Sequence, residues 1–74
     1  MVTEPAQQLT AHQAVVELCR ERGELATSAF HAALGDRFTP WEIANALEAG
    51  LMEYKLWVRF GWTDEGVGRI YSAR

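Results

Sequence analysis

The sequence predicts an α+β domain that is mainly helical, with three helices followed by short antiparallel strands and a short C-terminal helix. Three segments between residues 10 and 50 repeat apolar residues at helical spacing, each with its own start and stop signals. Residues 54–60 then alternate apolar and polar, which is the period of a strand with one buried face. Seventy-four residues suffice for one domain, and we expect it at 9–74 after a flexible tail at 1–8.

The first helix is predicted over about residues 10–22. Thr10 can cap it, and Gln13, three residues on, completes a capping box. Gly23 is the expected stop. The buried stripe comprises Ala11, Val15, Leu18 and Cys19.

A short edge strand is predicted at residues 24–26, directly before a second helix. Thr27 or Ser28 can cap that helix, and Gly35 ends it. Its apolar stripe comprises Ala29, Phe30, Ala33 and Leu34.

The third helix, predicted over about residues 40–49, has the strongest start signal. Thr39 caps it, Pro40 takes its first position, and Glu42 is placed for a capping box. Gly50 is the expected stop, with Leu51 making the accompanying apolar contact. The inward residues are Ile43, Ala46 and Leu47, and the outward ones are Trp41, Glu42, Asn45 and Glu48.

The strand after this helix is predicted to bury one face and expose the other. The face expected in the core comprises Tyr54, Leu56, Val58 and Phe60, and the open face carries Lys55, Trp57 and Arg59. No turn residue occurs near 55–57, so either one long strand runs to Gly61 or the strand pair is truncated. Thr63 is then expected to cap the C-terminal helix, which Ile70 and Tyr71 would dock on the core.

Composition and charge limit the possible functions. No apolar run is long enough to span a membrane and no secretory signal is recognisable, so we expect a cytoplasmic protein without a membrane partner. The net charge is −3 overall, about −5 over residues 1–53 and about +2 over residues 54–74. Any surface that neutralises phosphates must therefore include the C-terminal third.

Nothing in the sequence predicts catalysis. His12 and His31 lack partners at metal-ligand spacing, and Cys19 fits a small core residue better than a nucleophile. No glycine-rich phosphate loop is present. We expect no enzyme, no metal, no cofactor and no small-molecule substrate.

Two segments resemble the winged helix-turn-helix superfamily. Residues 46–51, Ala-Leu-Glu-Ala-Gly-Leu, are similar to the end of the recognition helix, and residues 62–66, Trp-Thr-Asp-Glu-Gly, to the segment after the wing. The likeness covers about residues 10–72, and its second segment resembles the Leu-Thr-x-x-Gly that follows the wing in regulators of the multiple-antibiotic-resistance and PadR types. It indicates no specific subfamily. It implies a short wing and a stand-alone DNA-binding protein acting in transcriptional regulation.

The resemblance implies contacts to double-stranded DNA from the third helix and the wing. The expected DNA-binding residues are Arg37, Thr39, Trp41, Asn45, Lys55 and Arg59. Each of these has another interpretation. Arg37 could instead pair with Asp36 or Glu42. Thr39, Trp41 and Asn45 could form a solvated helix face, with Trp41 partly packed on the second helix. Lys55 and Arg59 could lie on a solvent face where Trp57 covers their stems. The helix departs from the family because its outward face has no basic residue and two carboxylates, which phosphates repel.

The alternative is an acidic interaction module that binds protein and does not bind DNA tightly. The expected interface residues are Trp41, Leu56, Trp57 and Trp62, because tryptophan is enriched in interface hot spots. A long apolar strand at a sheet edge also favours pairing with a second copy. The partner would be a homodimer subunit or a host regulatory protein.

Overall fold

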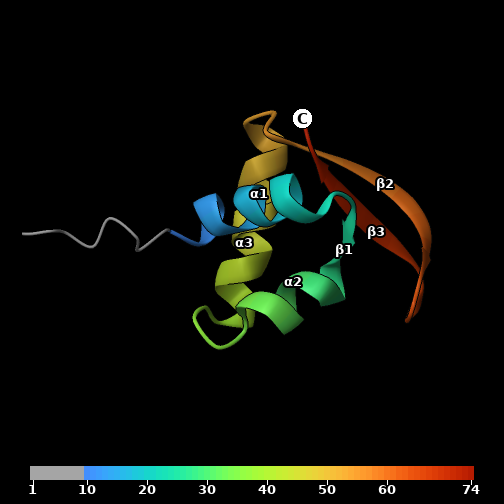
Figure 1. The fold of residues 1–74 in the computed structure, drawn as a ribbon, viewed down its shortest axis with the longest axis horizontal. Helices are drawn as coiled ribbons and strands as arrows, with labels where there is room; N and C mark the ends of the chain where they lie inside the picture. Colours follow the sequence, from blue (N-terminus) through green and yellow to red (C-terminus); the bar gives the residue numbers. More distant parts are fainter. Residues whose placement is uncertain (1–9) are drawn as a thin grey trace, which may run out of the picture.

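A computed structural model of the chain describes residues 10–74. The predicted tail at 1–8, together with Leu9, lies outside the described residues. The elements are α1 (Ala11–Arg22), β1 (Leu25–Ala26), α2 (Thr27–Leu34), α3 (Pro40–Met52), β2 (Leu56–Thr63) and β3 (Gly66–Ala73). The strands form one antiparallel sheet in the order β1-β3-β2, and the sheet flanks the helices (Figure 1). The α+β class is therefore confirmed.

Local sequence explains where α1 and α3 begin. Thr10 and Gln13 form the predicted capping box on α1, and Thr39 and Glu42 form the one on α3. Each box satisfies free N–H groups at a helix start. The predicted cap of α2 is wrong, because Ala26 occupies the cap position and makes no side-chain hydrogen bond.

The end predicted for α3 is also wrong, because the helix continues through Gly50 to Met52. Tyr54 takes the left-handed conformation after the helix, at φ 58°. Its N–H donates to the Leu51 carbonyl, and the Lys55 N–H donates to the Gly50 carbonyl, as in a Schellman motif. The glycine at position 50 instead allows Leu56 to pack closely against α3, because a Cβ there would lie 2.5 Å from Leu56 Cδ1.

The C-terminal helix that the sequence predicts is absent, and residues 66–73 form β3. Asp64 and Glu65 make a tight turn between β2 and β3, and Gly66 supplies the positive φ, 102°, that this connection needs. Thr63 Oγ1 accepts from the Glu65 N–H at 3.1 Å and donates to the Gly66 carbonyl at 2.7 Å. The Thr-Asp-Glu-Gly segment therefore forms a hairpin turn and does not begin a helix.

The core lies between the three helices and the base of the sheet. Its buried members are Ala14, Val15, Val16, Leu18, Cys19, Phe30, Leu34, Ile43, Ala46, Leu47, Leu56 and Tyr71. Phe30 and Tyr71 meet edge to face, with ring centroids 5.7 Å apart. Among the described residues, no helix is long and apolar enough to cross a membrane.

The predicted core face of the first long strand is only partly right. Leu56 is 2% exposed, but Tyr54 and Phe60 are 74% and 70% exposed, and Val58 is 37% exposed. Tyr54 precedes β2, in the turn after α3. Phe60 lies where β2 and β3 extend beyond the helices, so nothing in residues 10–74 covers it. The β2–β3 hairpin is therefore longer than the short or truncated strand pair that was predicted, since the strand runs past Gly61 to Thr63.

Candidate interaction surfaces on helix α3 and the β2–β3 hairpin

The outward face of α3 is exposed as predicted, and it carries no cation. Trp41, Glu42, Asn45 and Glu48 are all exposed. The Glu42 carboxylate is engaged by the Thr39 N–H at 2.8 Å. Trp41, 74% exposed, lines a shallow apolar groove with Ala11 of α1.

An ion pair that the sequence did not predict links α3 to the hairpin. Arg69 on β3 donates to Glu48 Oε2 at 2.9 Å. Contacts to the Tyr71 hydroxyl and to Glu48 raise the pKa of Arg69. The pair partly neutralises the Glu48 carboxylate on the outward face of α3, and it shows which face of the hairpin lies toward α3.

The strand register sorts the hairpin into two faces, because directly opposed residues of antiparallel strands share a face. Leu56, buried at one end, begins the inner face, and Trp57 begins the outer face. The inner face continues with Val58 opposite Tyr71, Phe60 opposite Arg69, and Trp62 opposite Val67.

Four inner-face residues form what we call the hairpin patch: Val58, Phe60, Trp62 and Val67. Phe60, Trp62 and Val67 are 70%, 81% and 64% exposed. They are close neighbours on two paired strands. The distal half of the hairpin thus exposes contiguous apolar side chains, and contiguous patches of this kind on soluble proteins mark interaction sites.

The two cations predicted for the wing lie apart and are unequally available. Arg59 is held by Glu24 through two hydrogen bonds of 3.0 and 2.7 Å. The Arg59 guanidinium lowers the pKa of Glu24. Lys55 precedes β2 and lies near Glu17 and Glu53. Lys55 therefore lies one residue before the strand that carries Trp57 and Arg59.

Other arginines contact aromatic rings. The Arg74 guanidinium lies 4.0 Å from the centre of the Trp57 ring and 5.5 Å from that of Tyr54. Arg37 lies 5.7 Å from the Phe38 ring, and within residues 10–74 it pairs with neither Asp36 nor Glu42. Arg37 is thus an exposed cation beside the start of α3.

The residues predicted for protein binding do not gather at one site. Trp41 lies on α3, Trp57 on the outer face of the hairpin, and Trp62 on its inner face. Leu56, predicted at an exposed tip, is a core residue. Phe60 and Val67 complete the exposed cluster around Trp62, and Val67 could not be found without knowing that residues 66–73 form a strand.

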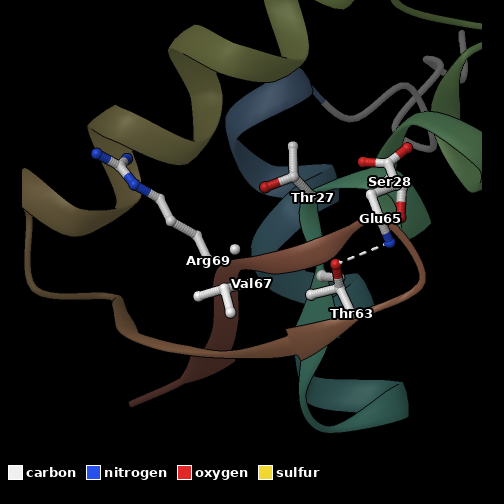
Figure 2. Close-up of a pocket in the computed structure, with 8 residues that line it drawn as sticks. Thr27, Ser28, Thr63, Glu65, Val67 and Arg69 are labelled. Atoms are coloured by element: carbon white, nitrogen blue, oxygen red, sulfur yellow. Dashed lines mark hydrogen bonds between the residues drawn. The ribbon is translucent and has the colours of Figure 1, made fainter.

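A small pocket lies between the hairpin and the start of α2. It is lined by Ala26, Thr27, Ser28, Thr63, Glu65, Val67, Gly68 and Arg69. Figure 2 shows the hydrogen bond that the Glu65 N–H donates to Thr63 Oγ1. It also shows that the Arg69 side chain points away from Thr27 and Ser28. Its mixed, open lining does not specify a ligand.

The titratable residues form no reactive cluster within residues 10–74. Burial raises the pKa of the Cys19 thiol to about 11, so it is uncharged and unreactive at neutral pH. His12 lies 3.5 Å from Glu53 between α1 and the end of α3. No three His, Cys, Asp or Glu side chains in this part of the chain could together hold a metal ion.

Comparison of the chain with protein-family models, with curated proteins and with solved structures found no match. The function is therefore argued from the surfaces themselves.

Proposed function

We propose that this chain is a winged-helix protein that binds another protein through the hairpin patch. The element order α1-β1-α2-α3-β2-β3 and the sheet order β1-β3-β2 support the fold. The single observation that carries the function is the exposure of Phe60, Trp62 and Val67 side by side on a strand pair. Burying such side chains drives association, and aromatic anchors dominate interface energies.

The charges around the patch also favour a protein partner over DNA. Asp64 and Glu65 form the hairpin tip, where a wing would approach phosphates. Glu48 lies on the outward face of α3, and Arg59 and Arg69 are already paired with carboxylates. A DNA-binding surface needs free cations, because phosphate neutralisation supplies most of the non-specific affinity.

Site-specific photo-cross-linking tests this proposal. A benzoylphenylalanine is placed at Trp62 or, as the matched control, at Trp41, which is a similarly exposed aromatic residue on α3. The full chain is irradiated in the cells that produce it. We expect a protein adduct from position 62 and none from position 41, and we expect Phe60→Ser to abolish the adduct. Equal adducts at both positions, or none at 62, would refute the hairpin patch as the contact surface.

DNA binding is the second candidate, favoured by the element order, which is the one used by DNA-binding winged helices. In this mode Thr39, Trp41 and Asn45 would enter the major groove, and Arg37 and Lys55 would contact phosphates. Arg59 is a weaker candidate because Glu24 holds it.

Fluorescence anisotropy with a random-sequence duplex at low and moderate salt tests this second candidate. If DNA is the ligand, binding weakens steeply with salt, and the double variant Arg37→Glu/Lys55→Glu loses affinity. Arg22→Glu, on the exposed end of α1, serves as the matched control. Absence of binding at low salt would eliminate the candidate.

A further inference from the structure

We propose that the partner is a second copy of this chain, which pairs antiparallel along the free edge of β2 with Phe60 at the two-fold axis. This inference rests on the proposed function and specifies its partner. It follows from the open strand edge, from the faces of the hairpin and from the charges at the two ends of β2.

Among residues 10–74, nothing pairs with the edge of β2 that faces away from β3. In the sheet order β1-β3-β2, the strand has a neighbour only on its β3 side within the described chain. The Arg74 N–H donates to the Lys55 carbonyl, so odd-numbered residues of β2 direct their backbone groups toward β3. The alternation of antiparallel ladders then directs the N–H and C=O groups of Leu56, Val58, Phe60 and Trp62 outward.

When the two-fold axis is perpendicular to the sheet, the inner faces of the two hairpins lie side by side on the same side of the combined sheet. With Phe60 on the axis, Phe60 lies opposite its own copy, and Val58 lies opposite Trp62 of the other copy. Val58, Phe60 and Trp62 of both copies then form one continuous ladder across the junction. Cross-strand pairs of aromatic with aromatic or β-branched residues are stabilising. In this register the free backbone N–H and C=O groups of the even-numbered residues in one copy also meet those of the other copy.

Charge complementarity selects this register among its neighbours. Lys55 stands at one end of the edge, and the carboxylates of Asp64 and Glu65 stand at the other. Antiparallel pairing about Phe60 ends with Thr63 opposite Trp57 of the second copy. It brings the Glu65 carboxylate, two residues beyond the strand in the turn, toward Lys55 of the second copy, twice by symmetry. Moving the axis to Arg59 would place like charges opposite each other, and moving it to Gly61 would leave Lys55 unpaired.

Arg59 does not oppose the pairing. In the proposed register it lies opposite Gly61 of the second copy. Its guanidinium already covers Gly61 of its own strand, since a Cβ there would lie 2.7 Å from Arg59 Nη1. Its charge is balanced by Glu24.

Sedimentation equilibrium of the purified full chain tests the proposal. We expect the mass to rise from 8.3 kDa toward twice that value with concentration. Phe60→Lys puts two cations face to face on the axis and should abolish the dimer. Phe60 is exposed in the monomer, so circular dichroism should show an intact fold.

A charge exchange tests the register. Lys55→Glu or Glu65→Lys alone should weaken dimerisation by roughly three- to thirtyfold, because each places like charges opposite each other twice. The double variant Lys55→Glu/Glu65→Lys should restore it. Both residues are exposed, and thermal melting at low concentration controls for effects on the monomer.

A wild-type chain that stays monomeric at millimolar concentration, or single variants that the double variant does not rescue, would overturn the proposal. A monomeric chain that still cross-links another protein from position 62 would refute the second copy alone and leave the proposed function standing. A monomeric chain without any adduct would remove both.

Discussion

Tyr54 shows how a single residue fixes the geometry between α3 and the hairpin. It occupies the left-handed position of the helix end, at φ 58°, which glycine usually takes because a Cβ is strained there. The two hydrogen bonds of the motif direct Lys55 and then β2 away from the helix axis. The strained tyrosine therefore sets where the hairpin begins.

We predict that Tyr54→Gly is more stable than Tyr54→Ala. Both variants lose the ring that Arg74 approaches, but only alanine keeps the strained Cβ, which costs about 1–2 kcal/mol. Urea denaturation of the two variants measures the difference in free energy of unfolding. Equal stabilities would show that this position bears no strain.

At the scale of elements, the hairpin depends on its turn. Gly66 has φ 102°, and a Cβ there would meet nothing within 4 Å, whereas Gly68 lies within the regular part of β3. We predict that Gly66→Ala destabilises the chain by about 1–2 kcal/mol through backbone strain alone. Gly68→Ala, the matched control, should be neutral or stabilising by about 0.5 kcal/mol. Thermal or urea unfolding of both variants checks the opposite signs.

The hairpin is also held across the sheet by Glu24 and Arg59. Because Arg59 lowers the pKa of Glu24, the pair stabilises the fold at pH values above the ordinary 4.5. That contribution is lost as pH falls through the lowered folded-state pKa. We predict that Glu24→Gln melts below wild type at neutral pH and that the two curves converge in acid. If the difference in melting temperature between the two proteins persisted at the lowest pH, this ion pair could not be its cause.

Sequence patterns predicted α1, the start of α3 and the edge strand, because capping boxes and helical periodicity are local signals. They failed at Gly50, where packing against Leu56 explains the glycine better than a helix stop. They failed again at residues 63–66, because Thr-Asp-Glu-Gly fits both a helix start and a tight turn. Pairing with β2 decides between them, and that contact is not local. Of the four residues in the hairpin patch, only Trp62 was predicted as an interface residue. Val58 and Phe60 were predicted in the core, and Val67 required the register.

At the scale of the whole molecule, the helices cover only the base of the hairpin. A chain this small buries a limited share of its surface. Leu56 and Tyr71 complete the core, and beyond them the inner face carries exposed apolar side chains. An exposed sheet edge beside such a face favours pairing with another chain, which agrees with the proposed dimer.

Nuclear magnetic resonance of the three tryptophan indole N–H groups tests the central claim most directly. Trp41 reports on α3, and Trp57 and Trp62 report on the hairpin. As protein concentration rises, we predict that the Trp62 signal shifts while the Trp41 signal stays fixed, and that adding duplex DNA moves neither. A Trp41 signal that moves with DNA, together with a Trp62 signal that never moves, would contradict the account.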